Sequence, residues 1–475
     1  MINFFSLKNI LILFLTSLNF TLFSQTLLIS DLEKINVNQE GSYRPRICLV
    51  NEGPLILFSE NSEENKIFIN KKQGEFWSGE QQINPDGIDI QMSASTGPSI
   101  ASNGQIVYVA YIVESNPRKI AFHKSDDGGD TFSPLNTALD LNEDYALGLD
   151  MILLPDGNPV IAFIHYDSNW TNVKQALIRS YDQGISFTEI ITIDDSPCEC
   201  CKPSLVSGEN YYGVSFRDNE SNIRVFKTRI SSNADANFSQ TVLTDPTEWE
   251  SVSCPASPSD GFLINDTLYN SWMSGSDGLP RVYLSKTKIL EDNILEWSEV
   301  DFSASTSFQN YPRIDGNSIF QMVVWEEFHE NYIDIFGKII HDDSGESSIS
   351  LTQGDSISNM ESVDIVFDSQ SNLFHLVYRN INQSAVMYRS IEPIIRDLSL
   401  PTSSNFKIYP NPTNHELFIS ENLYNLNYKI YNSLGTVVKT GFISNNITVE
   451  SLTKGSYILE LIDSTQNKRF WFIKN

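Results

Sequence analysis

Basic residues are scarce in this sequence: 32 lysines and arginines stand against 60 aspartates and glutamates, which gives a formal net charge of −28. Proteins that bind nucleic acid neutralise phosphates with a surplus of Lys and Arg, so the composition rules against a nucleic-acid partner. It also disfavours docking on an anionic membrane surface. Solubility is the plainest role for the excess of acidic residues.

Long apolar stretches are also lacking. The longest lies at the N-terminus, where Lys8 precedes an apolar run of about 14 residues from Ile10 to Phe23, followed by the small residue Ser24. A membrane-spanning helix needs about 20 apolar residues, so this run is short for a transmembrane anchor. Its layout is that of a secretory signal peptide. The sequence therefore predicts a signal peptide over residues 1–24 and no membrane span in the mature chain.

What the sequence does contain is an internal repeat with a period near 53 residues. Seven segments share a turn followed by an apolar strand that ends in an aromatic residue, and those aromatics are spaced 53, 52, 53, 56, 53 and 53 residues apart. They are Phe58, Tyr111, Phe163, Phe216, Trp272, Trp325 and Tyr378. Each segment predicts a β-hairpin, and a weaker second hairpin follows each of the first six.

Two octapeptides in the second hairpins fit the pattern Ser-x-Asp-x-Gly-x-Ser/Thr-Phe. Such a turn needs an Asp that accepts backbone N–H bonds and a Gly at a positive-φ position. The octapeptides resemble the Asp-box of sialidases and other BNR-repeat proteins, in which the box is a structural turn remote from catalysis. The resemblance therefore implies a structural role for Ser125, Asp127, Gly129 and Phe132, and for Ser180, Asp182, Gly184 and Phe187.

Two hairpins per repeat make a four-stranded antiparallel blade, and repeated blades close into a propeller. The expected fold is thus an all-β propeller over residues 25–393. Seven hairpins predict seven blades, whereas classical sialidases have six, and a six-bladed ring is the alternative. The last repeat has three clear strands, so we expect Thr26–Ser30 to supply its outer strand.

The repeat ends after Ile391, and a linker is predicted over residues 394–405. Alternating strands in residues 406–475 predict a small C-terminal β-sandwich. The motifs Tyr409-Pro410-Asn411-Pro412, Tyr431-Asn432-Ser433-Leu434-Gly435 and Leu452-Thr453-Lys454-Gly455-Ser456-Tyr457 resemble the type A sorting domain of the Bacteroidetes type IX secretion system. That resemblance implies the secretion machinery as a partner and a secreted or outer-surface location. The alternative is an accessory sandwich that binds carbohydrate.

Four arginines are phased onto one end of the propeller, where first strands start and second strands end: Arg46, Arg217, Arg313 and Arg379. Guanidinium groups suit a carboxylate, sulfate or phosphate ligand. Sialidases hold the substrate carboxylate with three arginines, and Tyr43–Ile47 loosely resembles the Arg-Ile-Pro motif of that family. The alternative for each arginine is a salt bridge on the surface or between blades.

Retaining sialidases also use a Tyr–Glu nucleophile pair and an Asp acid/base. The resemblance therefore implies catalytic candidates, and the spacing selects none of them over the others: Asp150, Glu250, Asp364 and Tyr378, with Tyr43 as a second tyrosine.

Cysteine is rare, with five residues in 475. Cys198, Cys200 and Cys201 precede the fourth predicted blade and Cys254 precedes the fifth, so their loops are neighbours at one end. The pattern resembles an uncharacterised Cys-x-Cys-Cys subset of sialidase-like BNR proteins. Three interpretations stay open: a disulfide between Cys254 and Cys198 or Cys200, metal binding, although the spacing matches no standard zinc site, or free or vicinally bonded thiols. We predict no cofactor and no metal, and Cys48 as a buried thiol.

These features predict an exported sialidase-like propeller that binds an anionic glycan or similar ligand at its axial face. The alternatives are an exo-glycosidase that hydrolyses terminal sialic or uronic acids, and a non-catalytic adhesion scaffold. Three arginines and a Tyr–Glu pair at one pocket would favour the enzyme.

Overall fold

The computed structural model describes residues 26–36, 42–60, 65–93, 96–114, 117–290, 293–300, 307–340, 348–352, 359–394, 407–419, 427–432, 436–442, 446–462 and 467–475. Every regular element in these ranges is a β-strand, and none is a helix that could cross a membrane. The predicted signal peptide and residues 395–405 of the predicted linker lie outside the described residues. The chain divides into two compact units, Met1–Arg396 and Asp397–Asn475.

The described part of the larger unit contains seven antiparallel sheets of four or five strands. The first four, in chain order, are sheet 1 (β3 Ser42–Val50, β4 Gly53–Glu60, β5 Lys66–Gln73, β6 Phe76–Trp77, β7 Gln81–Gln82), sheet 2 (β8 Ser99–Ser102, β9 Val107–Val113, β10 Arg118–Ser125, β11 Asn136–Asn142), sheet 3 (β12 Tyr145–Leu153, β13 Pro159–Tyr166, β14 Lys174–Arg179, β15 Ile191–Asp194) and sheet 4 (β16 Ser204–Ser207, β17 Tyr211–Arg217, β19 Phe226–Ser232, β20 Gln240–Leu243).

The other three sheets follow the same plan, and a short ribbon accompanies them. They are sheet 5 (β22 Asp260–Ile264, β23 Thr267–Ser274, β24 Arg281–Lys288, β25 Asn293–Glu299), sheet 6 (β26 Phe308–Gly316, β27 Gln321–Phe328, β28 Ile333–Ile340, β29 Ile349–Ser350), sheet 7 (β1 Thr26–Ile29, β2 Glu33–Lys34, β30 Met360–Asp368, β31 Leu373–Asn380, β32 Ala385–Ile394), and the ribbon of β18 (Ile223–Arg224) with β21 (Trp249–Glu250).

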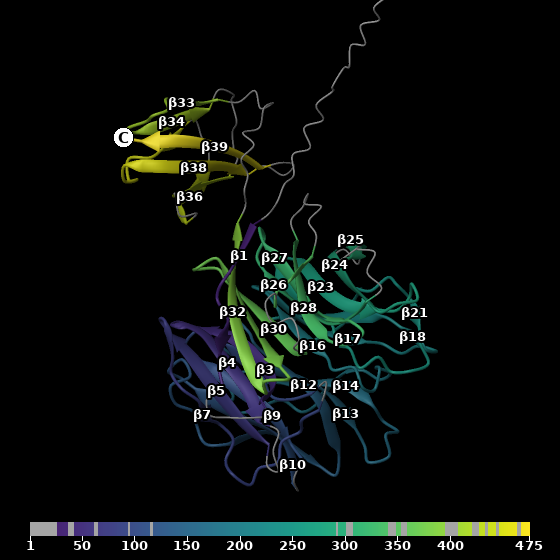
Figure 1. Ribbon diagram of the computed structural model, residues 1–475. Coiled ribbons are helices and arrows are strands. Elements are labelled where there is room, and N and C mark those ends of the chain that lie inside the picture. The colour runs from purple at the N-terminus through teal and green to yellow at the C-terminus, as the bar shows by residue number, and fades with distance from the viewer. Residues whose placement is uncertain are drawn as a thin grey trace, which may run out of the picture. The chain divides into compact units, whose positions relative to one another are not determined.

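The first strand of each sheet contacts the first strand of the next, through β3, β8, β12, β16, β22, β26 and β30. The last of these, β30, contacts β3 again, so the strands form a closed ring. Sheets that follow one another around a common centre make a β-propeller. In Figure 1, β3 lies next to β30 and β32, where the first and the last sheet of the ring meet.

The ring is closed by pairing between the two ends of the larger unit. β1 pairs antiparallel with β32, with Leu27 opposite Pro393 and Ile29 opposite Ile391. The predicted outer strand from the N-terminal segment is therefore confirmed, and β1 lies beside β32 in Figure 1. Across this seam the Ser30 N–H donates to the Ser390 carbonyl at 2.9 Å and the Ser390 N–H donates to Ser30 Oγ at 2.9 Å, so residues 360 positions apart are joined and the edge of β32 is covered.

The hydrophobic core lies between neighbouring sheets. Second strands such as β9 are buried along their whole length, because a sheet within the ring is covered on both faces. Each gap between sheets holds a cluster of large side chains; Phe122 and Phe163, for example, belong to the cluster shared by sheets 2 and 3. The aromatic residues of the repeat, including Trp272 and Trp325, are fully buried.

The smaller unit is built from two antiparallel sheets around one hydrophobic cluster that includes Leu417, Ile430 and Leu459. The strands are β33 (Ile408–Tyr409), β34 (Glu416–Ile419) and β37 (Ile447–Thr448) in one sheet, and β36 (Val437–Phe442), β35 (Asn427–Tyr431), β38 (Gly455–Ile462) and β39 (Asn467–Lys474) in the other.

Candidate functional site

A β-bulge interrupts the first strand of four sheets, namely sheets 1, 3, 6 and 7. The register shifts lie between Tyr43 and Arg46 in β3, and at the equivalent places in β12, β26 and β30. Each bulge contains a residue with positive φ: Arg44 (50°), Gly148 (65°), Tyr311 (50°) and Ser362 (57°). A bulge redirects the side chains of a strand, and bulky residues rarely adopt positive φ. The repeated bulges therefore distinguish this end of the propeller from the regular parts of the strands.

Three carboxylates each join one sheet to the following one: Asp150 and Asp364, which lie next to bulges, and Asp260, which begins β22. Asp150 Oδ2 accepts the N–H of Leu205 at 2.9 Å, and Asp364 Oδ2 accepts that of Ile47 at 3.0 Å. Asp260 makes the same bond, to Ile314, at 2.9 Å. The structure thus gives two predicted catalytic candidates, Asp150 and Asp364, a hydrogen-bonding role between sheets.

Two cations neutralise these carboxylates. The Arg313 guanidinium lies 3.4 Å from Asp260 and 3.6 Å from Asp364, and Lys202 Nζ lies 3.2 Å from Asp150. Burial raises the pKa of Asp260 to about 6, opposed mainly by Arg313. Burial likewise lowers the pKa of Lys202 to about 8. We call these residues, together with Arg46, the axial cluster, since they come from five of the seven sheets and interact electrostatically with one another.

Arg44 and Arg46 differ from Arg313. Each is 9% exposed, and no carboxylate lies within salt-bridge distance of either guanidinium in the described part of the chain. Arg44 Nε donates to the carbonyl of Ser93 at 2.9 Å, and Arg46 Nη1 donates to that of Pro45 at 3.1 Å. Burial, and next the proximity of Arg313, lower the pKa of Arg46 to about 10. Burial also lowers the pKa of Arg44. These are buried positive charges without a salt bridge in the described structure; Glu326 and Glu361 attract Arg44, and Asp364 and Asp150 attract Arg46, from beyond that distance.

A narrow depression, which we call the arginine pocket, opens among these groups. It is lined by Arg44, Arg46, Pro258, Tyr311, Pro312, Arg313, Glu326, Ser362 and Val363. Its volume of about 10 Å³ has room for about one water molecule or the end of one small polar group.

Glu326 supplies the carboxyl group of the pocket. Burial raises its pKa to about 8, and its Oε1 accepts the Ser362 N–H at 2.6 Å. Burial and the Glu326 charge raise the pKa of Tyr311. At neutral pH both side chains are therefore protonated, and both can donate a hydrogen bond.

The structure brings together only some of the predicted site residues. Arg46 and Arg313 line the arginine pocket. Arg379 lies over the Tyr43 ring at 4.4 Å and pairs with Glu361 at 2.6 Å, and Glu361 interacts electrostatically with Arg44.

The remaining predicted residues lie elsewhere. Arg217 is fully buried beside the cysteines, where its guanidinium lies 4.2 Å from the centre of the Phe226 ring. Glu250 is exposed on β21, and Tyr378 is buried in the cluster between sheets 6 and 7.

Sequence reasoning assigned no role to Arg44, Tyr311 or Glu326, although the phase of the repeat places Glu326 at the same end as the arginines. A usable signal was present, because Arg44-Pro45-Arg46 and Tyr311-Pro312-Arg313 carry the same Pro-Arg pair at the same phase of the repeat.

The two octapeptides predicted as Asp-boxes adopt the same hydrogen-bonded turn. Ser125 Oγ donates to Asp127 Oδ1 at 2.7 Å and accepts the Gly129 N–H at 2.8 Å. Ser180, Asp182 and Gly184 repeat both bonds at 2.8 Å. The rings of Phe132 and Phe187 pack against the clusters between sheets.

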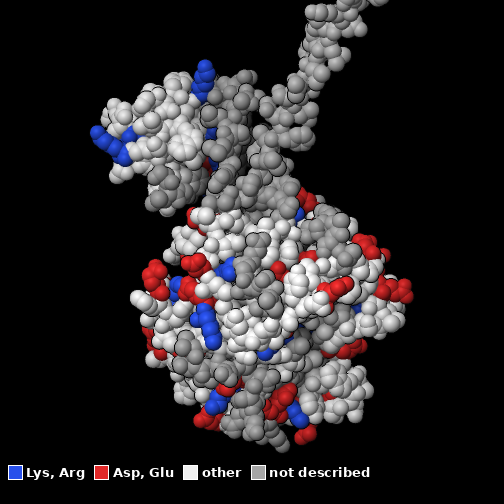
Figure 2. Space-filling view, viewed as in Figure 1, with Lys and Arg blue, Asp and Glu red and all other residues white. Residues whose placement is uncertain are grey.

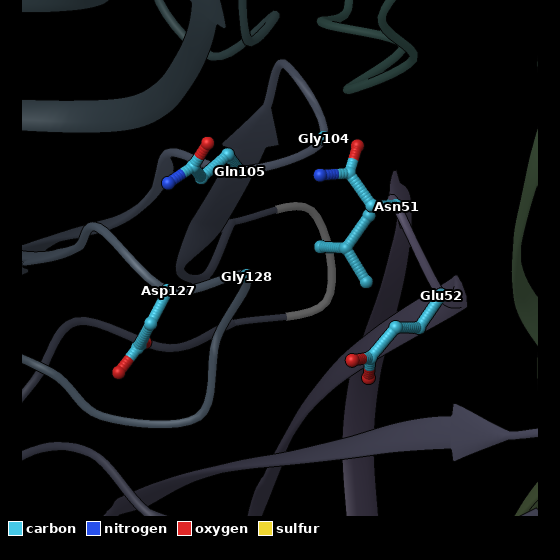
Figure 3. A pocket seen from close by; sticks show the side chains of 7 residues that line it. Asn51, Glu52, Gly104, Gln105, Asp127 and Gly128 are labelled. Carbon is cyan, nitrogen blue, oxygen red and sulfur yellow. The ribbon is translucent and has the colours of Figure 1, made fainter.

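A larger pocket, of about 210 Å³, lies at the first of these turns. Figure 3 shows Asn51, Glu52, Gln105 and Asp127 around it, with the Asn51 side chain directed toward Gly104. Its charged side chains, Glu52 and Asp127, are both acidic, so an anionic ligand would be repelled there.

The cysteine cluster, Cys198, Cys200, Cys201 and Cys254, lies where the loops before β16 and β22 meet. A disulfide joins Cys200 to Cys254 with a Cα–Cα distance of 6.5 Å, so the predicted bridge from Cys254 to the cluster is confirmed. Cys198 and Cys201 are buried free thiols, as is the distant Cys48.

The surroundings of the two free thiols in the cluster shift their pKa values in opposite directions. A hydrogen bond with Cys201, followed by the Arg224 and Arg217 charges, lowers the pKa of Cys198 to about 6 against the opposing effect of burial. Burial raises the pKa of Cys201 and of Cys48.

Comparison with solved structures returned proteins of low similarity. They include an uncharacterised protein from Dyadobacter fermentans (10% identity, TM-score 0.46, covering 78% of this chain and 99% of that one), the sialidase of Trypanosoma rangeli (9%, 0.40, 91% and 84%) and a Hadza microbial sialidase (13%, 0.40, 60% and 63%). The matched region is thus less than two thirds of the Hadza protein. These values carry no argument about activity, and comparison with curated proteins gave no match.

The comparison with protein families matched the C-terminal tail. Residues 407–475 match the family of secretion system C-terminal sorting domains. The predicted type IX tail is thereby confirmed, and it indicates export to the cell surface or release from the cell.

Proposed function

We propose that this exported protein binds the anionic end group of a surface ligand, such as a glycan carboxylate, in the arginine pocket of a seven-bladed propeller. The observation that carries the proposal is the pair Arg44 and Arg46, which are buried without an ionic partner in the described residues. In this proposal the seven sheets are the blades, residues 1–24 are the signal peptide, 394–405 the linker and 406–475 a small sandwich.

The physical argument rests on desolvation. A buried charge without a counter-ion is unfavourable, and natural proteins tolerate it mainly at functional sites. A carboxylate placed between Arg44 and Arg46 would supply charge-assisted hydrogen bonds to both. The acidic side chains spread over the larger unit in Figure 2 make this basic pocket a local exception on a chain of net charge −28.

The small volume of the pocket and the raised pKa of Tyr311 both favour ligand binding over hydrolysis. Pockets that enclose a small-molecule ligand usually measure about 300–1,000 Å³, whereas this one reaches only a single end group. A nucleophilic tyrosine needs activation toward its ionised form. The pKa of Tyr311 is instead raised by burial and by Glu326. An exo-glycosidase is therefore the weaker candidate, and a scaffold without any ligand would leave the arginine pair without a role.

Replacing Arg46 with methionine is expected to weaken binding of a carboxylate sugar by at least about 30-fold, because removal of one side of a buried charge pair loses about 2 kcal/mol or more. The measurement is calorimetric titration with N-acetylneuraminic and glucuronic acids, with galactose as the neutral comparison. Arg229→Met is the matched control, since Arg229 on sheet 4 pairs with Asp194 on sheet 3 and is not among the residues that line the pocket. Equal affinity for galactose and the acids would overturn the proposal, and turnover of a fluorogenic sialoside would favour the glycosidase.

Binding should also depend on the protonation of Glu326. Its pKa is about 8 in the folded chain against 4.5 for the unperturbed group, so it becomes anionic beside the ligand only above about pH 8. We expect affinity to fall as the pH rises through 8 in the wild type and to stay level in Glu326→Gln, in which the amide oxygen can still accept the Ser362 N–H.

The stability of the ligand-free protein provides a second readout of the same group. A folded pKa above the unfolded one gives stability that is full below pH 4.5 and lost as the pH rises through 8. Denaturant unfolding of the wild type and of Glu326→Gln should be measured across this pH range. The free energy of unfolding of the wild type, minus that of the variant, should therefore fall as the pH rises. A difference that rises with pH would contradict the assignment.

A further inference from the structure

The cysteine cluster has the geometry of a four-sulfur metal site. All four sulfur atoms lie within 4.8 Å of one another. Cys254 Sγ lies 3.5 Å from Cys198 Sγ and 4.0 Å from Cys201 Sγ, and the last two are 3.0 Å apart. In a tetrahedral zinc site with Zn–S bonds of 2.3 Å the sulfurs are about 3.8 Å apart. A small movement of these side chains would therefore place all four around one ion.

Two buried arginines face the cluster. Arg224 is 4% exposed, and its Nη1 donates to Cys198 Sγ at 3.0 Å. Arg217 is fully buried, and its Nε and Nη1 have no hydrogen-bond partner in the described structure. Both guanidinium groups interact electrostatically with Cys198. The carboxylate near Arg217 is that of Asp245, which already accepts hydrogen bonds from Phe226 and Thr247.

We propose that the reduced cysteine cluster binds one thiophilic metal ion of the Zn²⁺ type, and that the Cys200–Cys254 disulfide is the metal-free form of the same site. Four thiolates and one divalent ion carry a net charge of −2, which the charges of Arg217 and Arg224 balance. In the disulfide form the same two guanidinium groups face sulfur atoms that carry less negative charge. Thiolate ligands select zinc, copper(I) and iron–sulfur centres over magnesium and calcium.

The backbone supports this arrangement. The Cys200 N–H hydrogen-bonds to the Cys198 sulfur, and the Ser257 N–H to that of Cys201. Donors of this kind, together with the Arg224 side chain, are the outer contacts that orient and stabilise metal thiolates. Cys198 and Cys201 are buried, whereas Cys200 and Cys254 lie nearer the surface, which gives an ion a route of entry.

The test uses the full chain treated with a phosphine reductant. The phosphine breaks the S–S bond, takes one oxygen atom from water to become a phosphine oxide, and leaves two thiols. Zn²⁺ is then added, excess ion is removed, and bound metal is measured by elemental analysis. We expect one Zn²⁺ per reduced chain and none per oxidised chain. Co²⁺ in place of Zn²⁺ should give the charge-transfer absorption of tetrahedral thiolate coordination.

Variants separate this site from general thiol binding. Cys200→Ser is expected to abolish stoichiometric binding, and Arg217→Met to weaken it about 10–100-fold, the usual loss when an outer contact of a metal site is removed. Cys48→Ser is the matched control, because Cys48 is a buried free cysteine in β3 outside the cluster, and it should bind one ion like the wild type.

A folded, reduced chain that binds no Zn²⁺ would overturn the proposal, as would equal losses in Cys48→Ser and Cys200→Ser. If reduction unfolds the chain, recovery of the native tryptophan fluorescence on addition of Zn²⁺ supports the site. Failure to recover with Zn²⁺, combined with recovery on reoxidation, would show that the cluster serves only as a disulfide. Loss of carboxylate binding in Arg46→Met bears on the arginine pocket alone, so the two proposals fail independently.

Discussion

Replacing Arg313 with methionine is expected to lower the free energy of unfolding by about 3–5 kcal/mol, the usual loss when one partner of a buried ion pair is removed. The guanidinium of Arg313 on sheet 6 lies 3.4 Å from Asp260 on sheet 5 and 3.6 Å from Asp364 on sheet 7. Its charge therefore stabilises two carboxylates that themselves hydrogen-bond to neighbouring sheets. Without it, both carboxylates would remain largely buried, with no cation at that distance among the described residues.

Denaturant unfolding at pH 8 measures this loss, and the same measurement at pH 5 should give a smaller one. Burial already raises the pKa of Asp260 to about 6, so below that pH its carboxyl is largely neutral and depends less on Arg313. Arg46→Met is the matched comparison, because Arg46 forms no salt bridge in the described structure, and its removal relieves the repulsion with Arg313 while it loses the longer-range attraction of Asp364 and Asp150. We expect Arg46→Met to change stability little or to increase it. Equal destabilisation by the two variants would contradict the distinction between a structural and a ligand-binding arginine.

The propeller could be read from the sequence because its signal is local and repeated. An apolar second strand that ends in an aromatic residue reflects burial on both faces, and the structure buries most residues of those strands. The contribution of Thr26–Ser30 followed from the strand that the last repeat lacked, and β1 pairs with β32 accordingly.

The site was predicted less completely, because its chemistry depends on distances between sheets. The phase of the repeat correctly placed Arg46 and Arg313 at one end of the ring, where both line the arginine pocket. The repeat cannot tell that Asp150 bonds to the amide of Leu205, because that contact depends on how two sheets are staggered. A regular strand also gives no reason to expect positive φ at bulky residues such as Arg44 and Tyr311.

For the cysteines, too, one part of the arrangement could be predicted from the sequence and another part could not. Chain order alone predicted that Cys254 lies beside the Cys198–Cys201 loop, since both loops lead into first strands of consecutive sheets. The approach of all four sulfurs to within 4.8 Å, and the position of Arg217 beside them, depend on side-chain directions that spacing does not specify.

Deleting residues 406–475 is expected to abolish surface display and release, and to leave a folded propeller in the periplasm. The deleted residues contain the match to the sorting domain family and have a hydrophobic cluster of their own. The closing seam of β1 with β32 ends at Ile394, so truncation there leaves the ring intact. Cell fractionation with immunodetection measures the location, and thermal unfolding of the truncated protein should match the larger unit of the full chain.

A point variant distinguishes recognition of the folded tail from recognition of its sequence alone. Leu459 is fully buried in the cluster of the smaller unit, so Leu459→Asp places an unpaired carboxylate in that core and should unfold the tail. If the machinery recognises the folded domain, Leu459→Asp will be retained in the periplasm like the truncated chain. The matched control is Thr440→Asp, which makes the same change of charge at an exposed position of β36 outside that hydrophobic cluster and should be exported normally. Surface display of the truncated chain at the level of the wild type would contradict the role of residues 406–475 in export.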